Sequence, residues 1–479
     1  MNRITLLGLM GLLVASLGSF LVMLLSFYPG VVYGPDLEQQ LAQATGQIPF
    51  NDWHPPLMAL LWRLGISTTG KVSSLFLAEI SIFSLALTII SVSGYLSGKL
   101  KLLPASLIAL VPLFPPILIQ SGRLWKDQFL TFLLIGSIAA LWISGKKRKH
   151  LAWIAVFTVL ATAALLLRAN GIFAIIFLLP LAAWKTRQAL FRSHSNKSGS
   201  QISLRNKKII SLACVLVSLL AVNIGFKAAI RATANPTPTH QINQLLLDDL
   251  VNTASVEEIR ALDVSEGFKD YLVSATTNCA DEPRRQNLMW FECADAKLVK
   301  LEDGTEVFSG IYNFHDEFFD AWLSIVPRHI PKYVAYRLEM FSYFSFGTWT
   351  PSLNSISEHF SPKFETLHKA TSTYTDSMVD RWMPWLFCPG IYILINIATM
   401  VAGWKARRKL DKERFMFSFW ISATSLFWLV SQIPLVPAPD YRYAYLSIVL
   451  TPLSVIFLAS GFSKTDSKTL IAQSEQKID

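Results

Sequence analysis

Long apolar runs separated by short polar segments dominate this chain. A bilayer core about 30 Å thick needs roughly 20 apolar residues per helix, with a range of about 17 to 25. Ten runs come near this length and predict an all-α polytopic membrane protein with about ten transmembrane helices. The predicted spans are Leu6–Phe27, Val72–Leu96, Leu102–Ile119, Phe129–Ile143, Leu151–Leu167, Gly171–Trp184, Ile209–Phe226, Pro384–Val401, Phe415–Leu429 and Tyr445–Ser460.

The apolar stretch Leu151–Trp184 contains one interruption, Arg168-Ala-Asn-Gly171. As a single helix the stretch would be about 51 Å long, too long for one crossing. A tight turn at this interruption instead gives two spans. It also places the basic residues 146–149 on the same side of the membrane as those between 185 and 208, as the positive-inside rule requires.

Basic residues then fix the direction of the chain. With this arrangement 23 of the 43 Lys and Arg fall in one set of segments, six fall in the short segments opposite, and the remaining 14 lie in one long loop. The rule places the richer segments and both termini in the cytoplasm and gives the long loop little weight. The first span exceeds a normal signal-peptide core and lacks a clear small-residue cleavage site, so we expect an uncleaved anchor.

Composition agrees with an integral membrane protein. The 479 residues are 52% hydrophobic and 16% charged, against about a quarter charged in soluble domains. This excludes a disordered chain or a typical cytosolic enzyme. The net charge of +10 comes from short clusters between apolar runs rather than from one basic patch, which favours contact with membrane lipids over nucleic acid.

The chain divides into four parts. Residues 1–226 form an amino-terminal membrane module with a first external loop over 29–71. Residues 227–383 form a large extracytoplasmic loop with interfacial helices, which opens on the helix stop Asn235-Pro-Thr-Pro. Residues 384–462 hold the carboxy-terminal transmembrane helices, and 463–479 form a cytoplasmic tail.

Two of the four cysteines, Cys279 and Cys293, lie 14 positions apart in the large loop. In an oxidising compartment we expect them to form a disulfide, worth about 3 kcal/mol in the chain-entropy model. The alternative is two reduced, buried thiols. Cys214 and Cys388 fall in apolar spans and are expected to be inert packing residues.

The first external loop carries the candidate catalytic residues Asp36, Glu38, Asp52 and His54. Asp36 follows Gly-Pro and could simply cap a helix that runs to Gln43. It also lies eight residues past the first span, where partial desolvation would raise the pKa of its carboxyl and suit it to act as a general base or a metal ligand. His54 precedes two prolines and has a structural alternative.

Three further external segments carry cations near the membrane face: Arg123 with Lys126, Arg168, and Arg442 in Asp440-Tyr-Arg-Tyr443. Guanidinium groups bind phosphate with two parallel hydrogen bonds, and lysine adds a point charge. Snorkelling at span ends and an aromatic belt are the plainer explanations. Because all these candidates fall on one predicted side, they predict a single extracytoplasmic site.

Asp36, the element Trp53-His54-Pro55-Pro56-Leu57 and the succession of spans together resemble the GT-C-type integral membrane glycosyltransferases. Lys126-Asp127, Arg168 to Gly171 and Asp440 to Tyr443 resemble segments of the bacterial protein-mannosyltransferase and aminoarabinose-transferase branches. The resemblance covers most of the chain except about residues 236–320, and it implies a protein of a bacterial inner or plasma membrane.

The resemblance implies transfer of a sugar from a polyprenyl-phosphate carrier to an extracytoplasmic glycan, lipid or protein. It also implies that Asp36 is the general base or holds a divalent metal. Many relatives have adjacent Asp-Glu here, whereas Leu37 separates Asp36 from Glu38, so Glu38 and Asp52 stay open as alternatives. The donor phosphate would bind Arg123, Lys126, Arg168 or Arg442.

Other functions are compatible with this layout. An O-antigen-type polymerase would use a diphosphate-linked donor and would not need Asp36. A transporter or flippase predicts ionisable residues at mid-membrane, where only Glu79 lies within a predicted span. An envelope scaffold without chemistry would tolerate replacement of the first-loop carboxylates and the basic turns. No Gly-rich nucleotide-binding motif is present.

Overall fold

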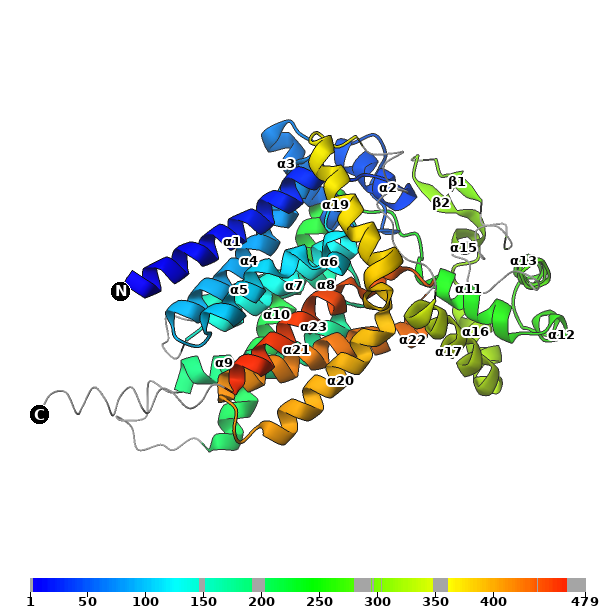
Figure 1. Cartoon of the computed structure of the whole chain (residues 1–479). Helices are drawn as coiled ribbons and strands as arrows, with labels where there is room; N and C mark the ends of the chain where they lie inside the picture. Colours follow the sequence, from blue (N-terminus) through cyan, green and yellow to red (C-terminus); the bar gives the residue numbers. More distant parts are fainter. Residues whose placement is uncertain are drawn as a thin grey trace, which may run out of the picture.

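A computed structural model describes residues 3–145, 151–191, 203–279, 294, 297–302, 304–347, 361–436 and 438–462. Helices make up nearly all of its regular structure, so the all-α prediction is confirmed (Figure 1). The described residues include one small sheet, in which β1 (Leu298–Lys300) pairs antiparallel with β2 (Glu306–Phe308).

Within the described residues, seven helical segments are long and apolar enough to cross a membrane by length and composition. They contain α1 (Arg3–Phe27), α4 (Ser74–Leu96), α7 (Lys126–Ile143), α9 (Gly171–Phe191), α10 (Leu204–Ala234), α21 (Lys412–Val430) and α23 (Tyr445–Gly461).

The three other predicted spans also fall on helices. These are α5 (Leu102–Leu110), which continues through η1 (Val111–Leu113) and α6 (Pro115–Leu118), α8 (Leu151–Leu167), and α20 (Pro389–Ala406). None of the three is among the seven segments that could cross a membrane, so the count of ten stays a prediction. The structure does support an integral membrane protein.

The predicted break at Arg168 is confirmed, because α8 ends at Leu167 and α9 begins at Gly171. The predicted span ends at Phe226, but the helix that contains it runs further. Helix α10 has 31 residues and continues to Ala234, which at 1.5 Å per residue makes it about 46 Å long. Asn235 ends it in a left-handed conformation with φ 39°, directly before the prolines predicted to stop it.

Helix α7 lies at the centre of the bundle, because 83% of the residues in its apolar stretch are buried. Helix α10 lies at the periphery, with only 11% of its apolar stretch buried. The peripheral α10 is the more apolar of the two, which suits a helix that faces lipid, whereas the polar residues of α7 face the interior of the bundle. Phe132 of α7 stacks on Phe83 of α4 with ring centroids 4.4 Å apart.

The bundle has two distinct ends. Helix α1 begins and α23 ends at one of them, here called the terminal end. At the other, the loop end, lie α2 (Pro35–Thr45), α3 (Leu57–Thr69) and η6 (Tyr441–Ala444) (Figure 1). Helix α19 (Glu365–Ser377) packs along α1, and η4 (Met378–Trp382) and η5 (Pro384–Phe387) lead from it into α20.

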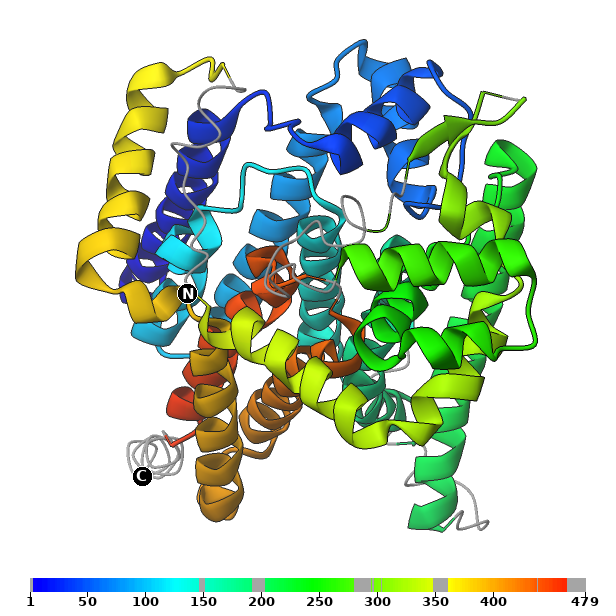
Figure 2. The ribbon, with the colours of Figure 1, turned by 90° about the vertical axis from the view of Figure 1, so that its right-hand side faces the viewer.

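A small helical domain follows α10 at the loop end (Figure 2). It has its own core, which includes Leu247, Phe268 and Phe318. Its elements are α11 (Ile242–Thr253), α12 (Val256–Arg260), α13 (Glu266–Asn278), α15 (Ser309–Asn313), α16 (Phe318–Ile325), η3 (Val326–Arg328) and α17 (Ile330–Phe346). Helix α17 joins this domain to the bundle through α20 and α22 (Gln432–Leu435).

Cys279, at the end of α13, is in a disulfide. Its expected partner Cys293 lies outside the described residues, so the predicted pairing stays a prediction. Cys214 and Cys388 are free thiols, but Cys214 is exposed and Cys388 is half-buried, so the expectation that both are buried packing residues is wrong.

Candidate active site at the loop end of the bundle

Asp36 lies in the first turn of α2, but its side chain does not cap that helix. Gly34 is the N-cap residue, with φ 98°, and no side-chain hydrogen bond caps the helix. The carboxylate instead approaches two other segments. Its Oδ2 accepts a hydrogen bond from Arg442 Nη1 at 3.1 Å, and its Oδ1 lies 3.5 Å from His54 Nε2.

His54 is buried, with 3% of its side chain exposed. Its Nδ1 lies 2.8 Å from Lys126 Nζ, at the start of α7. A lysine ammonium has no acceptor, so it donates to Nδ1 and leaves the proton of the neutral ring on Nε2. That proton faces Asp36, which gives the order Lys126, His54, Asp36, Arg442.

Arg442 is held from three sides. Asp440 accepts from the Arg442 backbone N–H at 3.0 Å and pairs with its Nε at 2.9 Å, and Nη2 donates to the Tyr443 hydroxyl at 3.4 Å. The guanidinium also lies over the Trp125 ring, 5.0 Å from its centroid. These contacts fix the fork of the guanidinium toward Asp36.

Arg168, in the turn between α8 and α9, forms an ion pair with Asp127, the second residue of α7. Its guanidinium lies 4.6 Å from the centroid of the Tyr443 ring, while that of Arg442 lies 5.3 Å from the same ring. Tyr443 therefore contacts both cations and brings them into one cluster.

Arg123 is 9% exposed and lies over Trp125, 4.6 Å from the ring centroid. Its segment is tied to the first loop, since Val31 N donates to Gly122 O at 2.8 Å. Gly122 is required for close packing, because a Cβ there would lie 2.2 Å from the Phe27 ring. Among the described residues Arg123 Nε has no hydrogen-bond partner.

The expected rise in the pKa of Asp36 is wrong. Burial raises the pKa of this carboxyl, but His54, Arg442 and Lys126 together outweigh burial and hold it well below its usual value. Opposite charges within a few ångströms favour the ionised form. Asp36 is therefore a carboxylate throughout the physiological range of pH.

Burial and nearby charges also shift the pKa values of the neighbouring groups. Burial, with Lys126 beside it, lowers the pKa of His54 to about 4, so the imidazole is neutral at pH 7. Burial raises the pKa of Asp440, and Arg442 opposes this. Burial lowers the pKa of Arg123 to about 10, which leaves the guanidinium charged at pH 7.

Two of the sequence candidates lie elsewhere. Asp52 Oδ1 accepts from Thr239 N at 2.6 Å and from Thr239 Oγ1 at 2.7 Å, so it ties the first loop to the segment after α10. Glu38 is exposed on α2. Neither has a described contact with Asp36, His54 or the four cations.

Two members of the cluster, Asp127 and Asp440, had no predicted role. Asp127 is adjacent to the predicted cation Lys126, and Asp440 lies two residues before the predicted cation Arg442. This adjacency was a usable signal, although Asp127 pairs with Arg168 of another segment rather than with its neighbour in sequence.

The residues around Asp36 do not fit a divalent metal ion. Mg²⁺ and Ca²⁺ take several oxygen ligands, and the described residues contain no group of three or more His, Cys, Asp or Glu that could hold a metal. Both Asp36 oxygens already face other groups, Arg442 and His54, and one of these is a cation.

The cluster contains four cations (Arg123, Lys126, Arg168 and Arg442) and three carboxylates (Asp36, Asp127 and Asp440), with His54 neutral. One positive charge is therefore in excess. Such a site can bind a phosphate group through the guanidinium and ammonium groups and can present Asp36 as an ionised acceptor for a hydroxyl proton.

No protein-family model matches the sequence, and no curated protein matches it. Two similar solved structures are those of ArnT from Cupriavidus metallidurans, one bound to undecaprenyl phosphate and one in the apo state. They share 13% and 12% sequence identity with this chain, each with a TM-score of 0.34 over 93% of this chain and 77% of theirs. Similarity at this level gives no information on donor, acceptor or mechanism.

Proposed function

We propose that this chain is a glycosyltransferase that transfers a sugar from a polyprenyl-phosphate carrier to an acceptor hydroxyl at the extracytoplasmic face of the membrane. The observation that carries the proposal is the position of Asp36. Its carboxylate lies between His54 and Arg442, next to Lys126, at one end of a bundle of membrane helices. The acceptor is a glycan, lipid or protein.

A lipid carrier suits this position. Apolar helices carry the cluster, and its cations come from the ends of α7, α9 and α23 or from the turns beside them. A polyprenyl chain in the bilayer would present its phosphate at this level, where four cations with one excess positive charge favour a phosphate group.

Three cations are suited to stabilise the leaving group. As the bond from the anomeric carbon to the phosphate oxygen breaks, both bonding electrons stay with the polyprenyl phosphate, whose charge increases. Arg442, Arg168 and Lys126 are already oriented by carboxylate, aromatic or imidazole partners. Donors oriented in advance stabilise developing charge without reorganising during the reaction.

Asp36 is the proposed proton acceptor. The acceptor oxygen bonds to the anomeric carbon as its proton moves to the Asp36 carboxylate. A low pKa makes Asp36 a weak base in the free protein. A phosphate anion beside Arg442 and Lys126 would offset the charges that lower this pKa, so donor binding would raise the basicity of Asp36.

His54 is a positioning residue in this mechanism. Its Nδ1 is occupied by Lys126 and its Nε2 carries the proton that faces Asp36. A neutral imidazole in this tautomer cannot accept the hydroxyl proton at Nε2. It orients the Asp36 carboxylate. The Lys126 ammonium polarises the imidazole ring, which strengthens the contact of the Nε2 proton with Asp36.

The decisive experiment compares transfer by wild type, Asp36→Asn and Asp52→Asn. Purified protein is incubated with labelled polyprenyl-phosphate sugars and a panel of acceptors. We expect Asp36→Asn to lose at least about 100-fold in rate, as is typical when a general base is removed. Asp52→Asn, a matched change at a carboxylate outside the cluster, is expected to keep its activity.

Other outcomes would assign a different function. Equal transfer by all three proteins would remove Asp36 from its role. Elongation that needs a polyprenyl-diphosphate donor and tolerates Asp36→Asn would identify a polymerase instead. Movement of the lipid-linked sugar across the membrane of vesicles, with no transfer product, would identify a transporter. Binding with neither transfer nor movement would identify a scaffold.

A further inference from the structure

A second cationic site lies at the terminal end of the bundle, away from the Asp36 cluster. The end of α9 and the starts of α10 and α21 enclose a cavity of about 320 Å³. Its lining includes three cations, Arg187, Lys207 and Lys412, and two aromatic residues, Trp184 and Phe191. The three cations come from separate helices and converge only in the folded chain.

None of the described carboxylates neutralises the charge of this cavity. Within the described ranges, none of the three cations forms an ion pair. The closest contact is that of Lys207 with an aromatic ring, since its Nζ lies 5.9 Å from the centroid of Phe191. The cavity therefore holds three uncompensated positive charges.

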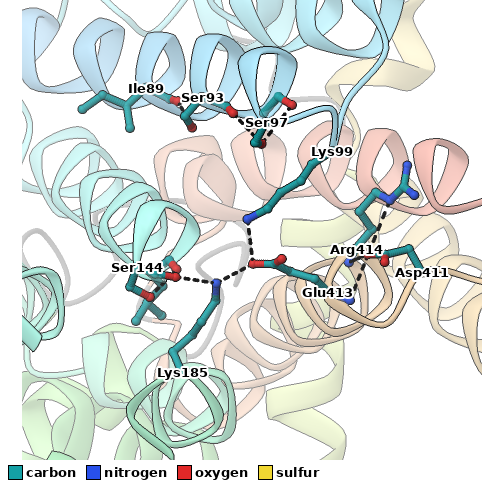
Figure 3. Close-up of polar contacts among 11 residues, drawn as sticks. Ile89, Ser93, Ser97, Lys99, Ser144, Lys185, Asp411, Glu413 and Arg414 are labelled. Atoms are coloured by element: carbon teal, nitrogen blue, oxygen red, sulfur yellow. Dashed lines mark hydrogen bonds and ion pairs between the residues drawn. The ribbon is translucent and has the colours of Figure 1, made fainter. Parts of the chain in front are cut away.

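Glu413, the carboxylate that follows Lys412 in the sequence, is engaged elsewhere. Its Oε1 lies 3.0 Å from Lys99 Nζ and 2.5 Å from Lys185 Nζ, and Lys185 also donates to Ser144 O at 3.0 Å (Figure 3). Although Glu413 follows Lys412 in sequence, two other lysines hold it away from the cavity.

Asp411 is engaged as well. Its Oδ1 accepts from the backbone N–H groups of Glu413 and Arg414 and caps α21, as Figure 3 shows. Both carboxylates beside Lys412 thus have partners within the protein, so neither is directed at the three cations of the cavity.

The surface that continues from the cavity is apolar. Helix α10 is the most exposed candidate span. Three and ten residues after Lys207, on the same face of the helix, come Ile210 and Val217, which are 39% and 65% exposed. A ligand with a charged group in the cavity would therefore have its remaining part against an apolar helix face.

We propose that this cavity binds the phosphate headgroup of an anionic phospholipid, with its acyl chains along α10. Basic pockets between membrane helices bind such headgroups, and Trp and Phe beside Lys and Arg suit the level of the membrane interface. A soluble phosphate would fill only the charged part. The site is separate from the proposed transferase site, so either proposal can fail alone.

Native mass spectrometry of the purified full chain tests this site. The protein is titrated in neutral detergent with phosphatidylglycerol, phosphatidylcholine or inorganic phosphate. Wild type is compared with a triple variant that carries Arg187→Gln, Lys207→Gln and Lys412→Gln. The control carries Arg205→Gln, Lys208→Gln and Arg408→Gln, which remove the same charge from exposed positions that do not line the cavity.

We expect one phosphatidylglycerol to bind wild type and the control with similar affinity and the cavity variant at least about tenfold more weakly. The single variant Lys412→Gln, at an exposed residue, should show a smaller loss in the same direction. Equal losses in the cavity variant and the control would overturn the proposal, because they indicate diffuse attraction. Equal binding of phosphatidylcholine, or full displacement by inorganic phosphate, would also overturn it.

Discussion

Arg442 Nη1 lies 3.1 Å from Asp36 Oδ2, which joins two residues 406 positions apart in the sequence. One comes from the first turn of α2 and the other from η6, just before the last helix. The pair links the two ends of the chain at the proposed site. Together with His54 and Lys126, Arg442 keeps the pKa of the half-buried Asp36 carboxyl below its usual value.

Replacement of Arg442 by Lys should weaken donor binding although the charge is kept. A lysine cannot hold Asp36, Asp440 and Tyr443 together as the guanidinium does. We expect kcat/KM for the lipid-linked sugar to fall by about 10- to 100-fold, about 1.4 to 2.8 kcal/mol of transition-state stabilisation. Steady-state kinetics and the inhibition constant of free polyprenyl phosphate measure this, and an unchanged inhibition constant would contradict a contact with phosphate.

His54 should make the protein less stable as the pH falls. Its pKa drops from 6.5 to about 4 on folding, so between these values the unfolded chain binds the extra proton. The stability that a neutral His54 provides is complete above pH 6.5 and declines as the pH falls toward 4, by roughly 3 kcal/mol in all.

The measurement is the difference in thermal midpoint between pH 8 and pH 5, taken for wild type and for His54→Gln. Burial raises the pKa of Asp248 to about 7, and this group acts with the opposite sign, since its contribution to stability falls as the pH rises from 4 to 7. Subtracting the shift in thermal midpoint of the variant from that of wild type removes the contribution of Asp248. A variant with the same pH dependence as wild type would rule out His54 as the source.

The Asp127–Arg168 ion pair should be structural as well as functional. Asp127 is 2% and Arg168 16% exposed, so Asp127→Asn leaves a largely buried cation without its carboxylate. We expect a loss of about 3 kcal/mol. The double variant Asp127→Asn/Arg168→Gln should recover much of this stability without recovering donor affinity. If the double variant also transfers sugar normally, Arg168 has no part in phosphate binding.

Arg337 should hold the helical domain against the bundle. Its Nη2 pairs with Asp249 at 2.6 Å, and its Nη1 donates to Val436 O at 3.1 Å, four residues before Asp440. Both side chains are buried. Arg337→Met should therefore cost about 3 to 5 kcal/mol and lower transfer activity by displacing Asp440. Arg328→Met, at an exposed arginine of η3, is the control and should change the thermal midpoint little.

Glu413 should be the main polar contact at the terminal end. Glu413→Gln leaves the buried Lys185 without its carboxylate and is expected to cost about 3 kcal/mol. Lys99→Met removes the outer, 33% exposed partner and should cost under about 1 kcal/mol. Thermal midpoints of the two variants give the comparison. Equal effects would show that Lys185 does not depend on Glu413.

Local signals in the sequence predicted much of the fold. The length of each apolar run and the position of its flanking charges are properties of contiguous residues, and each predicted span falls on a helix. The break at Arg168 followed from length and charge alone. The end of α10 at Ala234 agrees with the helix stop predicted at Asn235-Pro, although the apolar run itself ends earlier, at Phe226.

The site was predicted in part. Asp36, His54, Lys126, Arg168 and Arg442 do come together, since each lies beside a span end on the same predicted side. Asp52 and Glu38 share that side but face Thr239 and solvent. The side of the membrane on which a residue lies follows from the sequence around it. The direction in which its side chain points depends on the packing of α2 and α3.

The sequence by itself determined that this protein is a bundle of membrane helices with its reactive side chains gathered at one end, because hydrophobicity and charge act over adjacent residues. Only the tertiary structure decided which cation meets which carboxylate, and hence that Asp36 is strongly ionised rather than raised in pKa. The physical reason is that the interaction of two charges depends on the distance between them, and residues 406 positions apart acquire that distance only when the chain folds.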